Sequence, residues 1–347
     1  MTFPTNDRAV SVNLVQDKYA APPPEIQTSD DTIVDINDAG YETDSSNSSI
    51  STSLSLSVVD YPFENGRRYH KFREGRYCFP NDELEQERED RIHELMVYLF
   101  NRLHFAPVGV NPKNILDLVT GTGMWAIEIG NRYPNANVLG VDLSAIQPEW
   151  VPPNVRFMVD DVESEWAQPR NHFDYINSRN MVLAVRSWPR LFRQALRDLK
   201  PGAWMEMQEF DHLPQSQYGS IPLNHPVSKY WDLLGSGLSC LGVNSKVTVF
   251  LADMMRDAGF QNVSSRILRI PIGEWPEDDL LKMVGRYFKS ILIDGIQSMA
   301  LRPLTRGLMW SREEVEVWLV EERRAYKDDL FYSHMPLHII SGQKPSL

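Results

Sequence analysis

The chain has 347 residues, of which 42% are hydrophobic, and a formal net charge of −12. This length suits one large domain or two small ones, and the acidic balance argues against an extended surface that binds nucleic-acid phosphates. The two cysteines are too few for a disulfide framework and have no partners as metal ligands, so we expect a reducing intracellular location, cytoplasmic or nuclear, and no metal site. No apolar run reaches the roughly 20 residues of a membrane helix, and no signal peptide is recognisable, so we expect no membrane contact.

Residues 1–59 differ in composition from the rest of the chain. Nine acidic residues stand against only Arg8 and Lys18, so this stretch carries −7 of the total charge. Its prolines and its serine-rich run from Ser45 to Ser57 bury too little apolar surface to offset the entropy of ordering. We predict a disordered, solubilising tail. A segment regulated by phosphorylation or by docking on a partner protein is the alternative.

Aromatic and basic side chains are concentrated between Tyr61 and Cys78. Such a mixture can stack on bases and pair with phosphates, but it is short and isolated in an acidic chain, so we expect no direct contact with nucleic acid. A helix follows, capped by Asn81 or Asp82, with Glu83 in its first turn and apolar residues at helical spacing.

The most informative stretch is a strand, a turn and a helix between Asn114 and Arg132. The apolar run from Asn114 to Val119 predicts a buried strand, and Gly121 and Gly123 predict a turn that lets the backbone approach a ligand. The helix begins at Met124 and offers unpaired N–H groups at its start. A second strand, Asn137 to Val141, ends in Asp142, 19 residues after Gly123, which suits a carboxylate that binds a ribose diol. These features predict the nucleoside-binding half of an α/β fold.

Two further carboxylates indicate which nucleoside is bound. The pattern Gly121-x-Gly123-x-x-Ala126 also fits a dinucleotide site, but alone it is a weak signal. Asp117 lies inside the first strand, where it would repel a pyrophosphate and attract an ammonium group. Asp161 follows a third strand, Asn154 to Val159, where an adenine amino group could donate to it. A ligand with a ribose, an adenine and an amino-acid end but no phosphate satisfies all three carboxylates, and that ligand is S-adenosylmethionine (SAM).

The fourth and fifth predicted strands supply further candidate residues. The strand Phe173 to Asn177 ends beside the predicted site, so Asn177 and the residues up to Asn180 are placed to line it. After a helix from Trp188 to Leu199 and a strand from Ala203 to Phe210 comes His212. This is the only histidine that we propose as a general base, because an unperturbed pKa near 6.5 suits proton removal at neutral pH. A hydrogen-bonding role in a loop or pocket is the stronger alternative.

The remaining chain alternates between insertions and elements of the sheet. We expect an insertion over residues 213–245, a helix from Lys246 to Ala258 and a strand from Arg266 to Pro271. A second insertion over 272–332 contains two helices, and Pro336 to Gln343 forms an antiparallel seventh strand. The insertions carry many aromatic residues and are expected to build the substrate pocket. The predicted fold is α/β, with a Rossmann-like, largely parallel seven-stranded sheet and helical cap insertions.

The ordered motifs resemble those of class I SAM-dependent methyltransferases. The resemblance rests on Asp117-x-x-x-Gly121-x-Gly123, on Asp142 and Asp161, and on the run from Leu199 to Trp204. The runs Gly121 to Ala126, Val141 to Val155 and Trp188 to Leu191 more narrowly resemble the fungal LaeA-like methyltransferases. The resemblance extends from Tyr61 to Gln343.

It implies a methyltransferase domain over 60–347, with an N-terminal cap and helix (60–110), a SAM-binding core (111–212) and the two cap insertions. It also implies roles for single residues. Asp117, Gly121 and Gly123 would bind the methionine end of SAM, Asp142 the ribose and Asp161 the adenine, with Asn177 beside the reacting methyl group. The matching N-terminal segment of the family folds over its cofactor, so Tyr69 and Tyr77 would cover the ligand and Arg73 would lie near its carboxylate.

One residue departs from the family pattern and keeps several functions open. Val119 stands where the superfamily usually has glycine, and its β-branched side chain would crowd the methionine end. The favoured function is methylation of a small molecule in fungal secondary metabolism. The alternatives are a LaeA-like nuclear regulator that acts with partner proteins and a SAM-fold scaffold without methyl transfer. An NAD-dependent dehydrogenase comes last, because it leaves Asp117 and Asp161 unexplained.

Overall fold

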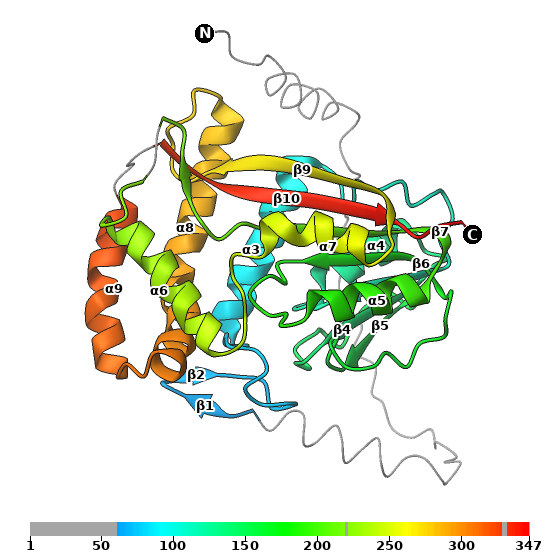
Figure 1. The fold of residues 1–347 in the computed structure, drawn as a ribbon, viewed down its shortest axis with the longest axis horizontal. Coiled ribbons are helices and arrows are strands. Elements are labelled where there is room, and N and C mark those ends of the chain that lie inside the picture. Colours follow the sequence, from blue (N-terminus) through cyan, green and yellow to red (C-terminus); the bar gives the residue numbers. More distant parts are fainter. Residues whose placement is uncertain (1–60, 219–220, 328–331, 347) are drawn as a thin grey trace, which may run out of the picture.

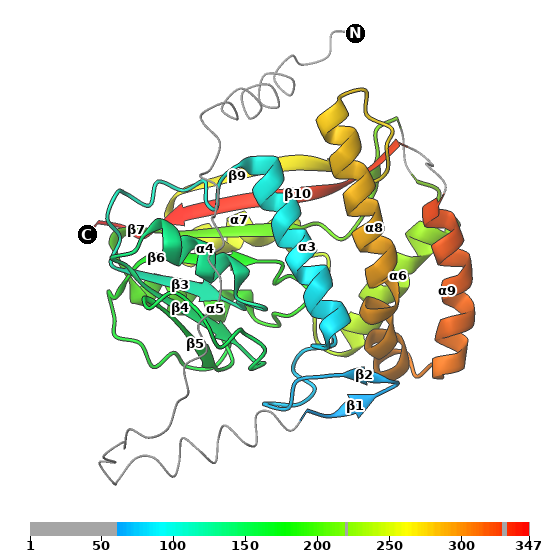
Figure 2. The ribbon, with the colours of Figure 1, turned by 180° about the vertical axis from the view of Figure 1, so that it is seen from behind.

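A computed structural model describes residues 61–218, 221–327 and 332–346. The tail predicted over 1–59 lies outside these residues. The described chain forms a central twisted sheet with helices on both faces. A further group of helices lies beyond one end of the strands (Figures 1 and 2).

Five strands form the parallel part of the sheet. They are β3 (Asn114–Leu118), β4 (Asn137–Asp142), β5 (Val155–Val159), β6 (Phe173–Arg179) and β7 (Leu199–Phe210), in the order β5-β4-β3-β6-β7. The chain runs outward from β3 to β5 and then returns to pair β6 with the other side of β3. Ligands of such sheets bind where the strand order reverses, at the carboxyl ends of the strands.

The rest of the sheet is antiparallel. Strand β10 (Ser333–Gln343) lies between β7 and β9 (Gln261–Pro271) and runs antiparallel to both. The two-residue strand β8 (Gln215–Ser216) pairs with the start of β10, so the sheet has eight strands within the described residues rather than the seven predicted. The α/β fold and the antiparallel last strand are confirmed.

Helices cover both faces of the sheet. Helices α3 (Glu83–Phe100) and α4 (Met124–Arg132) lie over one face, and α5 (Trp188–Asp198) and α7 (Leu251–Asp257) lie over the other (Figures 1 and 2). A 3₁₀ turn (Thr248–Phe250) leads into α7. Helix α3 begins as predicted at the second of the two candidate caps, because the side chain of Asp82 accepts a hydrogen bond from the backbone N–H of Glu85 at 3.2 Å.

The remaining helices form a cap beside α3. Helices α6 (Pro226–Cys240), α8 (Asp279–Arg302) and α9 (Arg312–Lys327) stand together beyond the strand ends, with a π-helical turn (Pro303–Gly307) after α8 (Figure 1). A Cβ on Gly237 of α6 would lie 2.3 Å from the carbonyl oxygen of Pro303, so only glycine allows this close approach. The hairpin of β1 (Phe63–Glu64) and β2 (Arg67–Arg68) joins the cap, because Glu64 pairs with Arg302 at 2.8 Å.

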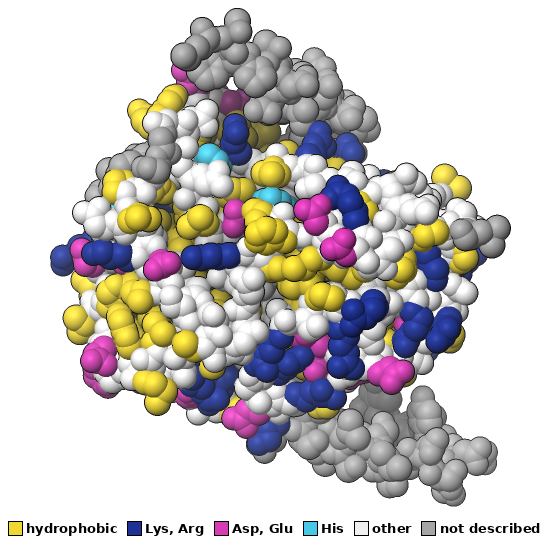
Figure 3. Space-filling model, in the orientation of Figure 1, with side chains coloured by type: hydrophobic (Ala, Val, Ile, Leu, Met, Phe, Trp, Pro, Cys, Tyr) yellow, Lys and Arg dark blue, Asp and Glu magenta, His cyan; other side chains and the backbone are white. Residues whose placement is uncertain are grey.

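On the face seen in Figure 3, basic side chains gather in the lower half with acidic and apolar ones among them. Within the part of the chain that the structure describes, no helix is long and apolar enough to cross a membrane.

Candidate active site

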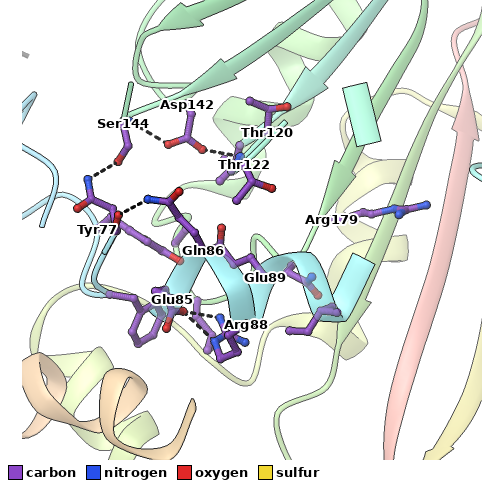
Figure 4. A pocket seen from close by; sticks show the side chains of 18 of the residues that line it. Tyr77, Glu85, Gln86, Arg88, Glu89, Thr120, Thr122, Asp142, Ser144 and Arg179 are labelled. Atoms are coloured by element: carbon purple, nitrogen blue, oxygen red, sulfur yellow. Dashed lines mark hydrogen bonds and ion pairs between the residues drawn. The ribbon is translucent and has the colours of Figure 1, made fainter. Parts of the chain in front are cut away.

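A cavity opens at the carboxyl ends of β3, β4 and β5, and helix α3 lies across it (Figure 4). One end is lined by the loops after these strands, which include Gly121, Asp142 and Asp161. The other end is lined by side chains of the cap and of the segment after β7. The predicted nucleoside site and the predicted substrate pocket therefore form one continuous space.

Asp117 holds the turn after β3 in place. Its side chain is only 3% exposed, and it accepts hydrogen bonds from the Thr120 hydroxyl at 2.6 Å and from the Asn177 side-chain amide at 2.7 Å. Desolvation raises the pKa of the Asp117 carboxyl, and the two hydrogen bonds oppose this shift. Asn177, predicted to bind the cofactor, is fully buried beside Asp117 on the neighbouring strand β6 and does not line the cavity, so its contact here is with Asp117.

The backbone of the turn is joined to Asp142 at the end of β4. One carboxylate oxygen of Asp142 accepts the N–H of Gly121 at 2.9 Å and the other accepts the N–H of Ser144 at 2.9 Å. The Asp142 side chain points into the cavity beside these loops (Figure 4). Burial raises its pKa to about 6, so this carboxylate is ionised at neutral pH. Gly123, at the start of α4, does not line the cavity. It faces the ring of Phe157 on β5.

Asp161, at the end of β5, is paired with the N-terminal segment. Its carboxylate accepts a hydrogen bond from Arg73 at 3.0 Å and lies 3.4 Å from Arg76. Arg73 is therefore at the predicted adenine end and not near the predicted position of the cofactor carboxylate. Tyr77 lines the cavity as expected, whereas Tyr69 is fully buried under the guanidinium of Arg302, 3.3 Å from its ring centroid.

Helix α3 presents a charged face to the cavity. Gln86 and Glu89 project from the helix toward the loops that contain Thr122 and Asp142, whereas Glu85 and Arg88 line the cavity from the other side of the helix (Figure 4). Arg88 donates to Glu85 at 2.9 Å from Nε, and this carboxylate raises the pKa of the guanidinium. This face could not be predicted from the sequence, because helical periodicity marks apolar positions and does not show which polar positions face a cavity.

The cap end of the cavity is mainly apolar and aromatic. The rings of Phe210 and Phe288 stack with centroids 5.1 Å apart, and the ring of His212 stacks on Trp231 at 5.4 Å. Burial lowers the pKa of His212 to about 3, which contradicts the ordinary value assumed for a general base. At neutral pH His212 is an uncharged ring that can accept a hydrogen bond but binds a proton weakly.

Comparison with known proteins identifies the chain. The model of a methyltransferase domain family matches residues 87–265. Methyltransferase pytC of Aspergillus terreus is 37% identical over 90% of this chain and 95% of its own length. The secondary metabolism regulator LAE1 of Cochliobolus heterostrophus is 35% identical over 81% of this chain and 94% of its own length. The chain belongs to the LaeA-like methyltransferases. The predicted enzyme class, a SAM-dependent methyltransferase, is confirmed. A third relative, the protein-methionine methyltransferase laeA of Emericella nidulans, is 33% identical to this methyltransferase over 81% of this chain and 76% of its own length.

The site of this methyltransferase fits SAM. Gly121 has φ +56°, a left-handed conformation that favours glycine, and the Glu89 carboxylate lies over it, 2.9 Å from the position of a Cβ. Asp142 offers an ionised carboxylate for a diol, and the cavity has more carboxylates than guanidinium groups, which suits a cationic ligand. When bound, the cofactor supplies a methyl group on a positively charged sulfur, and the chain contributes binding, alignment and exclusion of water.

Val119, the residue that departs from the family pattern, keeps the backbone conformation of glycine. Its φ is +53°, in the left-handed region that a β-branched residue adopts at a cost of about 1–3 kcal/mol. Its half-buried side chain lines the cavity and packs against the core. The turn is thus open to a ligand, but the isopropyl group occupies part of the space beside it.

Val119→Gly is expected to tighten SAM binding by about 1 kcal/mol, because it clears this space. The free energy of unfolding should change by less than about 1 kcal/mol. Glycine relieves the backbone strain of the folded state. This gain is offset by the larger conformational entropy of glycine in the unfolded chain and by the loss of a half-buried side chain, each worth about 1 kcal/mol. Calorimetric titration and urea unfolding measure the two effects. Val119→Thr keeps the branched shape and should bind SAM like the wild type; equal binding by all three proteins would contradict crowding.

Proposed function

We propose that this methyltransferase transfers the methyl group of SAM to a small, ring-bearing apolar molecule enclosed in the cavity. The observation that supports this is the continuity of the cavity from the turn at Gly121 to the aromatic side chains of the cap. Its far end is lined by Phe210, Trp231 and Phe288, each at most 4% exposed. Flat rings bind well between aromatic side chains, and a water-free chamber favours transfer of a positively charged methyl group.

The proposed assignments divide the site into two parts. Gly121, Asp142, Asp161 and Tyr77 would bind the cofactor, with Asp117 and Gly123 holding the turn behind them. The cap insertions, residues 213–245 and 272–332, would enclose the acceptor, and His212 would accept a hydrogen bond from it. The match with pytC, described as a methyltransferase, supports this function.

A second function is methylation of a protein, or regulation together with partner proteins. It is favoured by the relatives whose descriptions name a regulator and a protein-methionine methyltransferase.

The two functions are distinguished by incubating the protein with SAM that carries a deuterated methyl group. The acceptors offered are a panel of small phenols and aromatic acids and, separately, methionine-containing peptides. We expect the label on a small molecule, as seen by mass spectrometry. Label on the peptides alone would contradict the proposed acceptor class.

Phe288→Leu is expected to raise the KM for the small acceptor about tenfold, because it removes one of the stacked rings from the chamber. The affinity for SAM should stay within about twofold, since Phe288 lies on α8 away from the cofactor loops. Phe100→Leu is the matched control: Phe100 is equally buried, at 1% exposed, and does not line the cavity. An equal rise in KM for both variants would show a loss of fold stability instead of a role in acceptor binding.

A further inference from the structure

The acidic residue expected to receive the amino group of the cofactor is already engaged. Each carboxylate oxygen of Asp117 accepts a hydrogen bond from a neighbouring side chain, Thr120 on one side and Asn177 on the other. Asp117 lines the cavity, but only 3% of its surface is exposed and both of its oxygens are engaged, so its main contacts are with the turn. A cationic ligand at this turn therefore needs a further carboxylate that makes no other hydrogen bond.

Glu89 of α3 is placed to be that partner. Its carboxylate oxygen Oε2 lies 2.9 Å from the point where a Cβ on Gly121 would stand, so it sits directly over the turn. The side chain is half-buried and lines the cavity between α3 and the loops (Figure 4). Within the described residues, the Glu89 carboxylate makes no hydrogen bond and no ion pair.

The groups around Glu89 leave an excess of negative charge. On its own helix are Glu85, Arg88 and Asp90, and Asp142 and Tyr77 face it from the loops. Arg88 is held by Glu85 at 2.9 Å, and Asp90 accepts the hydroxyl of Thr122. Desolvation and then the charge of Glu85 raise the pKa of Glu89 to about 8. At pH 7 this carboxyl is therefore mostly protonated until a cation arrives.

We propose that Glu89 is a cofactor-binding residue, and that its carboxylate binds the α-ammonium group of SAM over Gly121. The inference rests on the proposed function, since it assumes that SAM occupies the cavity. Binding is a proton exchange: the ammonium group donates hydrogen bonds to the ionised carboxylate, and the proton that Glu89 held passes to the buffer. Asp117 keeps the turn in the shape that this contact requires.

Titration calorimetry with SAM at pH 7, in two buffers with different ionisation enthalpies, counts the protons released. The wild type should release about one proton more than Glu89→Gln. The variant should bind both SAM and S-adenosylhomocysteine about tenfold more weakly, because both ligands carry the amino group. Glutamine resembles the protonated carboxyl of the free protein, so the variant should fold normally. Glu87→Gln, an exposed position on the same helix, is the matched control and should leave both quantities unchanged.

Three other outcomes would contradict the inference or the proposed function. Equal affinity and equal proton release in wild type and Glu89→Gln would overturn the inference while leaving SAM binding intact. A loss of affinity for SAM but not for S-adenosylhomocysteine would place Glu89 beside the positively charged sulfur and overturn the assignment to the amino group. A wild type that binds neither ligand would overturn the proposed function and this inference together.

Discussion

Asp142→Ala is expected to weaken SAM binding by about 1–3 kcal/mol, or roughly 5- to 150-fold. The carboxylate is fixed by the N–H groups of Gly121 and Ser144, so it is already oriented toward the cavity before a ligand arrives. Its removal takes away the proposed acceptor for the ribose hydroxyls and leaves two backbone donors without a partner. Because its pKa is about 6, binding by the wild type should also weaken as the pH falls through 6.

Asp174→Ala is a close control for this variant. Asp174 also accepts two backbone N–H groups, those of Lys113 and Asn114, each at 2.9 Å, but it lies at the amino end of β6 and does not line the cavity. The Asp174→Ala variant should have a lower free energy of unfolding but an unchanged affinity for SAM. If calorimetry shows that Asp142→Ala binds SAM as tightly as Asp174→Ala, the ribose assignment is wrong.

Gly123→Ala is expected to lower the free energy of unfolding by about 2–5 kcal/mol. Gly123 has φ +86°, and a Cβ there would lie 2.4 Å from Cζ of the Phe157 ring. The left-handed conformation costs an L-residue about 1–2 kcal/mol, and overpacking against the ring adds about 1–3 kcal/mol. Urea unfolding followed by circular dichroism measures the change.

The two costs can be separated within this chain. Gly75 has φ +82° but nothing within 4 Å of its Cβ position, so Gly75→Ala should show the conformational cost alone. Addition of Phe157→Leu to Gly123→Ala should recover part of the loss by making room for the methyl group. Equal destabilisation by Gly75→Ala and Gly123→Ala would show that the ring of Phe157 moves away at no cost.

The sequence predicted the elements whose signals are local. The strand before Gly121 and the helix from Met124 to Arg132 lie where they were expected, because an apolar run, two glycines and a helical pattern follow one another directly. Strand β7 begins earlier than predicted, at Leu199, because this residue pairs with Phe173 of β6. A boundary set by a partner strand cannot be read from the segment itself.

The parts of the site that depend on distant packing were not predicted. Glu89 and Phe288 meet the same cavity from α3 and α8, and single-sequence patterns do not show that these helices lie side by side. The low pKa of His212 depends on burial beneath the cap, which its position after a strand does not reveal. For Val119 the identity of the residue predicted crowding, while its left-handed backbone could be seen only in the structure.

The position of β10 has a consequence for how the chain is made. This strand follows every other strand of the sheet in the described chain, yet it lies between β7 and β9. Until it arrives, β7 is an open edge and β9 has no neighbour, so the nascent chain exposes unpaired strands that invite association with other chains. Met335 of β10 also lines the cavity, so the cavity is completed only after β10 has been made. A premature stop shortly before Ser333 would therefore produce an aggregation-prone protein with an incomplete chamber, and not merely a shortened enzyme.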